Sequence, residues 1–209
     1  MMKKKHLAML LSQLMPNPKP RLIWEGYTID AESAAEIAYI AFMHGDIKGK
    51  RVADLGCGSG ILGIAAALLG ACQVFGIDID KTAIKTAVLN AEKVNVNIDF
   101  AIGDIECVIN SFDTTIMNPP FGTWKRGVDV KFLRKALEIS DVVYSLHKRS
   151  DSVRLFLEDK IRRMDGEISW IKEINLTIGR TYQFHKKRKY QVEADLYRIT
   201  HLDQSCNSR

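Results

Sequence analysis

Four residues that could hold an amine directly follow a short apolar run at 114–117, which predicts a buried strand; they are Asn118, Pro119, Pro120 and Phe121. Two adjacent prolines hold φ at about −65° and remove two backbone donors, so they end the strand abruptly. The Asn118 side-chain oxygen and the Pro119 carbonyl can each accept one N–H of a planar amine. Phe121 offers a face for the attached ring. Prolines after a strand also open ordinary loops, so these four residues alone do not distinguish an amine-binding site from a loop.

A glycine-rich turn lies upstream, between a strand that begins at Arg51 and an apolar helix at 61–69; its ligand-facing candidates are Asp54, Gly56, Gly58, Ser59 and Gly60. Glycines let the backbone approach a ligand closely, and the helix start supplies unpaired N–H groups. Ile61 stands where a dinucleotide fingerprint has its third glycine, which disfavours nicotinamide and flavin cofactors. No Gly-Lys-Ser/Thr follows, so the turn is not a nucleotide triphosphate loop.

Acidic residues end the next two predicted strands. Asp78 ends the run at 74–78, where a carboxylate can accept both hydroxyls of a ribose. Asp104 follows the run at 98–102 and is a candidate partner for an adenine amine. Each acid alone could be a helix cap or a loop charge. Together, ribose and adenine contacts without a grip on a pyrophosphate predict S-adenosylmethionine at the carboxyl ends of the strands.

These segments resemble the class I methyltransferases that act on exocyclic amines. More narrowly, the chain resembles the methyltransferase-like enzymes of archaea and eukaryotes that methylate N6 of one adenine in small-subunit ribosomal RNA. The resemblance spans roughly residues 20–199. Its motifs are Asp54–Gly60, Gly76–Asp80, Ile116–Thr123, Tyr144–Lys148 and Phe184–Lys187.

The expected fold is α/β. The patterns predict a doubly wound, mostly parallel sheet, and the resemblance implies the seven-stranded, Rossmann-like class I methyltransferase form with one antiparallel strand near the C-terminus. Besides the strands already named, strands are expected at 141–146, 168–176 and 192–200, with helices at 3–14, 31–41, 61–69 and 81–94. The predicted organisation is an N-terminal helix and Pro-rich hinge at 1–20, a methyltransferase domain at 21–200 and a tail at 201–209.

The resemblance also implies roles for single residues. Asn118, Pro119, Pro120 and Phe121 would hold and stack the target adenine. The implied cofactor residues are Tyr27, Thr28, Asp54, Gly56, Gly58, Ser59, Gly60, Ile61, Asp78, Asp104, Ile105 and Asn118. The chain departs from the family at 25–29, where Gly26 and Ile29 replace a Gln and a Thr that usually reach the cofactor.

The formal net charge is +5, and the basic excess lies at 147–190. A basic cluster is often only a solvated face, but here it flanks the predicted adenine site, which favours contact with phosphates. The proposed RNA-binding residues are His147, Lys148, His185, Lys186, Lys187 and Arg188. Neither histidine is assigned a catalytic role.

No run approaches the roughly 20 apolar residues that span a bilayer, so a cytoplasmic protein is expected. The four cysteines have no CxxC spacing, which disfavours a metal site in this chain. The resemblance implies a possible partner, a small zinc-ribbon activator protein that forms a heterodimer. Two alternatives stay open: another planar acceptor, in protein glutamine, DNA adenine or tRNA guanine, or a binding module that holds RNA without catalysis.

Overall fold

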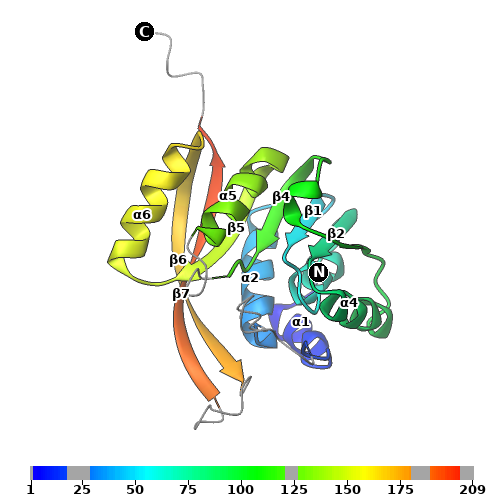
Figure 1. Ribbon diagram of the computed structural model, residues 1–209. Coiled ribbons are helices and arrows are strands. Elements are labelled where there is room, and N and C mark those ends of the chain that lie inside the picture. Colours follow the sequence, from blue (N-terminus) through cyan, green and yellow to red (C-terminus); the bar gives the residue numbers. More distant parts are fainter. Residues whose placement is uncertain (1, 18–28, 121–126, 180–188, 203–209) are drawn as a thin grey trace.

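The computed structural model describes residues 2–17, 29–120, 127–179 and 189–202, which form one seven-stranded sheet with helices on both faces (Figure 1). The strand order is β3-β2-β1-β4-β5-β7-β6. The strands are β1 (Arg51–Leu55), β2 (Gln73–Asp78), β3 (Asp99–Ile102), β4 (Phe112–Met117), β5 (Ser140–Lys148), β6 (Gly166–Gly179) and β7 (Lys189–His201). The helices are α1 (Lys4–Leu11), α2 (Ala31–Met43), α3 (Ile61–Leu68), α4 (Lys81–Lys93), α5 (Val128–Ile139), α6 (Asp151–Arg162) and the short 3₁₀ helix η2 (Ile105–Cys107).

Strands β1 to β5 pair in parallel, and β7 runs antiparallel to both of its neighbours, β5 and β6. The expected doubly wound, mostly parallel sheet with one reversed strand near the C-terminus is therefore confirmed. Helices α5 and α6 were not among the expected elements.

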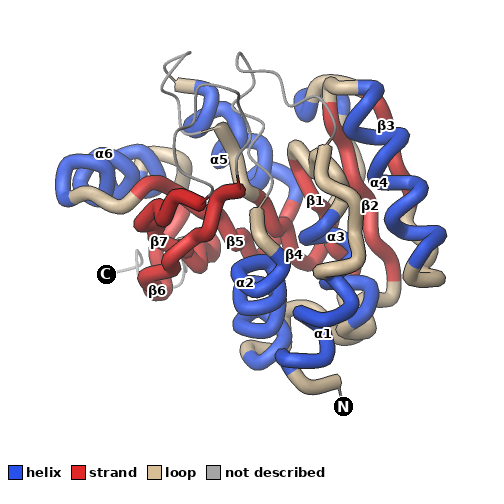
Figure 2. Tube along the Cα trace, turned by 90° about the horizontal axis from the view of Figure 1, so that it is seen from below, coloured by secondary structure: helices blue, strands red, loops and turns tan. Residues whose placement is uncertain are grey.

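Alternation along the strands builds two cores, one on each face of the sheet. Val52 and Ile116 face the first core with α1, α2 and α3, whereas Ala53 and Met117 face the second core with α5 and α6. Figure 2, which looks from below, shows these two groups of helices on opposite sides of the strands.

The N-terminal helix belongs to the first core, because Leu7 and Leu11 are fully buried in it. Buried Asn90 of α4 holds the chain after α1: its side-chain oxygen accepts from Met15 N at 2.8 Å, and its Nδ2 donates to Met15 O at 2.9 Å. The predicted division near residue 20 falls outside the described residues. In the part of the chain that the structure describes, no helix is both long and apolar enough to cross a membrane.

The chain reverses its direction of winding at β1. From β1 it moves outward through β2 to β3, and β4 then returns to the other side of β1. In open α/β sheets, ligands bind at such a switch point, beyond the carboxyl ends of the strands. Leu55 of β1 pairs with Ile77 of β2 and with Met117 of β4. The glycine turn, Asp78 and Asn118 thus follow mutually paired residues at one edge of the sheet.

Candidate active site

Hydrogen bonds fasten the glycine turn to the end of β2. Gly56 N and Cys57 N both donate to Ile77 O, at 2.8 and 3.0 Å, and Gly58 N donates to Asp78 Oδ2 at 2.9 Å. The other oxygen of Asp78 accepts from Asp80 N at 2.8 Å. These bonds give the turn and the Asp78 carboxylate one fixed relative position, as a ribose site requires.

The turn has one closed side and one open side. A Cβ at Gly56 would lie 2.8 Å from Cε1 of Phe132, and a Cβ at Gly60 would lie 3.0 Å from Cβ of Ala87. Gly58 adopts a φ of 54°, and a Cβ there would meet no atom of the described residues within 4 Å. A ligand can therefore approach the backbone at Gly58, while core side chains occupy the space behind its neighbours.

Buried carboxylates make the turn suited to a cation. Asp54 is 1% exposed and accepts from Gly63 N at 2.8 Å; burial, with a smaller contribution from Asp78, raises its pKa to about 7. Burial also raises the pKa of Asp78, and it raises the pKa of the Cys57 thiol between them. A positively charged ligand here would be attracted to both carboxylates and would favour their ionised forms.

Asn118 carries an unsatisfied oxygen at the same edge. Its Oδ1 is buried and has no hydrogen-bond partner among the atoms that the structure describes. Pro119 is buried and Pro120 is half-buried. A buried polar atom without a partner is costly and calls for a functional reason. An amine donor from a ligand would satisfy it. Phe121, predicted to stack on the base, lies outside the described residues.

The predicted adenine residues lie beyond β3. Asp104 caps η2 by accepting from Glu106 N at 3.0 Å, and Lys131 of α5 donates to both of its oxygens, at 2.8 and 2.9 Å. Ile105 is buried in the core on the α5 face, so its side chain anchors η2, directly after Asp104, to the body of the protein.

Ser59 and Ile61, which were predicted to contact the cofactor, are both buried. The Ser59 carbonyl accepts from Asn90 Nδ2 at 3.0 Å, which connects the turn to α4. Tyr27 and Thr28, predicted to contact the cofactor, are not among the described residues.

Two apolar residues at this edge were missed by the sequence reasoning. Ile79, directly after Asp78, is 47% exposed, and Ile102, the last residue of β3, is 53% exposed. Ile79 directly follows Asp78, and Ile102 lies two residues before Asp104, so both are exposed apolar residues next to the predicted cofactor acids. An apolar residue directly after the acid that ends β2 was the available signal for Ile79. No local sequence pattern pointed to Lys131, which holds Asp104.

The predicted RNA-binding residues do not share one environment. His147 is 2% exposed; its Nε2 lies 2.7 Å from Ser145 Oγ, and its ring meets the edge of Tyr197 at a centroid distance of 5.5 Å. Burial lowers the pKa of His147 to about 3, so the imidazole is neutral. This position does not support the predicted contact of His147 with RNA, whereas Lys148 is exposed. The remaining candidates, His185, Lys186, Lys187 and Arg188, lie outside the described residues.

Several basic side chains at 147–179 are engaged by acids of the chain. Arg154 binds both oxygens of fully buried Asp195, at 2.7 and 2.8 Å, and Arg149 binds Glu173 at 2.6 Å. Arg162 and Arg163 pair with acids one turn earlier on α6. Arg154 therefore joins α6 to β7, whereas the pairs of Arg162 and Arg163 stay within α6 and its C-terminal cap. No group of His, Cys, Asp and Glu that could hold a metal ion occurs among residues 2–17, 29–120, 127–179 and 189–202.

A seven-stranded sheet with one reversed strand, a glycine turn at its switch point and carboxylates at the adjoining strand ends define a Rossmann-like methyltransferase fold. Residues 40–118 match the family model described as ribosomal protein L11 methyltransferase (PrmA). A solved structure described as a putative RNA methyltransferase from Pyrococcus horikoshii is similar, with a TM-score of 0.90 and 36% identity. That match covers 97% of this chain and 100% of the other.

Two curated relatives match nearly end to end. The rRNA N(6)-adenosine-methyltransferase METTL5 of Danio rerio is 38% identical, over 95% of this chain and 99% of the relative. The rRNA N(6)-adenosine-methyltransferase Mettl5 of Drosophila melanogaster is 37% identical, over 87% of this chain and 88% of the relative. The chain belongs to this family of methyltransferases, and the resemblance read from its motifs is confirmed.

Proposed function

We propose that the protein transfers a methyl group from S-adenosylmethionine to the exocyclic N6 amine of an adenine in RNA, and that this RNA is small-subunit ribosomal RNA. The observation that carries the proposal is the buried Oδ1 of Asn118, which has no hydrogen-bond partner among the described residues. Asn118 directly follows Met117, and Met117 pairs with Leu55, the last residue before the glycine turn. An oxygen in that position accepts one proton of an amine held next to the cofactor. The near full-length match to rRNA N(6)-adenosine-methyltransferases supports ribosomal RNA as the acceptor.

The residues at the switch point fit the cofactor. We assign Asp78 to the ribose hydroxyls and the open side of Gly58 to the approach of the ligand; the hydrogen bond between these two residues supports this assignment. Burial raises the pKa of Asp54 and of Asp78, and a ligand that carries a sulfonium and an ammonium group would favour their ionised forms and be attracted to them. When bound, S-adenosylmethionine supplies an electrophilic methyl group on sulfur.

Asn118 then acts by orientation. By accepting an N–H from N6, its oxygen holds the amine so that the nitrogen lone pair points at the methyl carbon. The amine held by Asn118 would supply the attacking lone pair, and S-adenosylmethionine would supply the methyl group and leave as S-adenosylhomocysteine. The proton that the amine gives up would pass to water. Proximity and orientation supply the main catalytic effect. His147 takes no part in proton transfer, because it is buried, neutral and bonded to Ser145.

The adenine must leave its stack to reach Asn118. This costs a few kcal/mol in a duplex and less where the base is already unpaired. Lys148 and the basic residues at 185–188 are proposed to contact phosphates, which positions the RNA without reading its sequence.

The setting of the reaction is part of the proposal. We place the protein in the cytoplasm, as is expected of an enzyme that acts on ribosomal RNA. A small zinc-ribbon activator would pair with an edge strand, and β3 forms one edge of the sheet. Near it, Ile102 is 53% exposed and Ile109 is 89% exposed, so a partner there would cover apolar surface.

The test is methylation of ribosomal RNA with S-adenosylmethionine labelled in its methyl group, followed by mapping of the modified nucleotide. We expect label in N6-methyladenosine at one position of the small-subunit RNA. Label in protein glutamine, in DNA or in a guanine of tRNA, with none in ribosomal RNA, would overturn the proposed acceptor. Failure of the protein to bind S-adenosylmethionine would overturn the proposed reaction.

A further inference from the structure

Lys131, near the start of α5, holds the Asp104 carboxylate in one orientation. Its Nζ lies 2.8 Å from Oδ1 and 2.9 Å from Oδ2, and Oδ1 also accepts from Glu106 N at 3.0 Å. The side chains of Lys131 and Asp104 are 34% and 45% exposed. The carboxylate is therefore oriented from two elements, α5 and η2, and remains accessible to a ligand.

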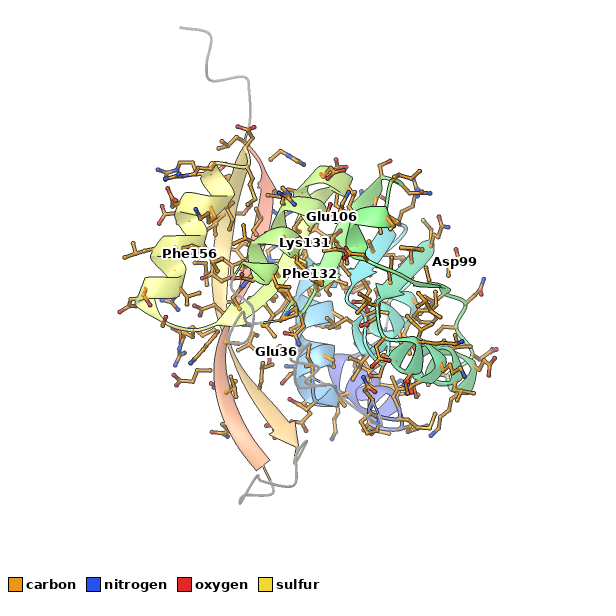
Figure 3. All side chains as sticks on the ribbon, viewed as in Figure 1. Glu36, Asp99, Glu106, Lys131, Phe132 and Phe156 are labelled. Carbon is orange, nitrogen blue, oxygen red and sulfur yellow. The ribbon has the colours of Figure 1, made fainter. Side chains whose placement is uncertain are left out.

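Phe132, the next residue of α5, reaches the other end of the site. Its Cε1 lies 2.8 Å from where a Cβ at Gly56 would stand, so the ring packs against the backbone of the glycine turn. Figure 3 labels Lys131 between Glu106 and Phe132. Two neighbouring side chains of one helix thus contact the turn after β1 and the acid beyond β3.

The same helix follows the acceptor corner in the chain. Asn118 is connected to α5 through residues 119–127, and α5 begins after Gly127, whose carbonyl accepts from Lys131 N at 3.0 Å. A helix that contacts both ends of the cofactor site therefore also continues the segment assigned to the acceptor.

We infer that Lys131 is a positioning residue for the cofactor. It orients Asp104 so that the carboxylate accepts the exocyclic amine of the cofactor's adenine. The inference rests on the proposed function, because it assigns the adenine end of that cofactor to Asp104. The consequence is selective: loss of Lys131 weakens recognition of the adenine amine and leaves the chemistry at Asn118 intact.

Arg134 offers a matched control on the same helix. Its NH2 pairs with Glu106 Oε1 at 3.1 Å, so Arg134 engages the acid next to Ile105, whereas Lys131 holds the Asp104 carboxylate. Removing either residue deletes one cation from the contact between α5 and η2. An ion pair that only stabilises this contact would make the two variants alike.

The experiment measures calorimetric affinities for two ligands, S-adenosylhomocysteine and its inosine analogue, in which a carbonyl replaces the adenine amine. In the unaltered protein, the adenine ligand binds more tightly than the analogue. In Lys131→Met we expect this preference to fall about tenfold, as for the loss of one hydrogen bond to a charged group. Arg134→Met should keep the full preference for the adenine ligand, and Lys131→Arg should retain most of it. The kcat of Lys131→Met, measured at saturating cofactor, should stay within about twofold of the unaltered value.

Equal weakening of both ligands in Lys131→Met, or the same loss of preference in Arg134→Met, would overturn the inference. Should Lys131→Met fail to fold, Asp104→Asn gives the second measurement: an unchanged preference there would also overturn it. Failure of the unaltered protein to bind S-adenosylhomocysteine would instead count against the proposed function. The two failures are therefore distinguishable.

Discussion

The backbone N–H of Gly58 donates to Oδ2 of Asp78 across 2.9 Å, which joins the turn after β1 to the carboxylate at the end of β2. This bond requires Gly58 to expose its N–H toward β2, and the backbone achieves that with a φ of 54°. No atom of the described residues lies within 4 Å of the Cβ position of Gly58. One residue thus sets both the orientation of the acid and the path by which a ligand reaches it.

We expect Gly58→Ala to weaken binding of S-adenosylmethionine at least tenfold, because the methyl group would enter the open side of the turn. Gly45→Ala is the control: Gly45 also has a positive φ, of 80°, with nothing within 4 Å of its Cβ position, but it lies in the loop after α2. Both variants should lose about 1–2 kcal/mol of stability from left-handed strain. Calorimetry and denaturant unfolding separate the two effects, and equal affinities in the two variants would contradict the assigned path.

Asn118→Ala should reduce kcat by at least about a hundredfold, since a misplaced amine loses its alignment with the methyl carbon. Affinity for S-adenosylhomocysteine should change less than threefold. The variant should also be as stable as the unaltered protein or more so, because it removes a buried oxygen that has no partner among the described atoms. Turnover that survives the substitution would remove Asn118 from the mechanism.

The raised pKa of Asp54 predicts a pH dependence of folding. The folded carboxyl has a pKa of about 7, against an ordinary 3.8, so folding takes up a proton between these values. The contribution of Asp54 to the free energy of unfolding should therefore fall as pH rises through this window, by up to about 1.4 kcal/mol per pH unit, and it is measured as the difference between the unaltered protein and Asp54→Asn. Asp54→Asn should lack this slope. Denaturant titrations at pH 5, 6 and 7 measure it, and parallel curves for the two proteins would refute the assignment.

The lowered pKa of His147 predicts a slope of the opposite sign. The folded imidazole has a pKa of about 3, against an ordinary 6.5, so the unfolded chain binds a proton that the folded chain does not. Stability from this group is complete above pH 6.5 and is lost as pH falls toward 3. His147→Gln should reduce this loss between pH 6.5 and 4, whereas His6→Gln, which removes an exposed imidazole of α1, should not. An acid-induced loss identical in all three proteins would contradict the buried, neutral His147.

Local pattern was enough to place many of the elements. The helix expected at 61–69 is α3 (Ile61–Leu68), and the strand expected at 141–146 is β5 (Ser140–Lys148). In α6, which was missed, Val153, Leu157 and Ile161 recur every four residues after the Ser150 cap, whose Oγ accepts from Val153 N at 3.2 Å. That signal was present in the sequence.

Other features depend on residues distant in the chain. Alternation along β5 places Ser145 and His147 on one face, but their burial comes from Tyr197 and Asp195 of β7, which pair with them. No local pattern distinguishes a buried histidine of this kind from one that faces RNA. The pairing of Lys131 with Asp104 likewise joins residues brought together only by the packing of α5 on η2.

Asn90 gives the amino-terminal residues an unexpected reach. Its side-chain Nδ2 donates to the carbonyls of both Met15 and Ser59. This one side chain therefore connects the N-terminal segment to the glycine turn of the proposed cofactor site. Truncating or tagging the N-terminus is therefore expected to lower the affinity for the cofactor even when every residue of the proposed site is intact. Comparisons among variants should keep residues 2–15 unchanged before any loss of methylation is attributed to catalysis.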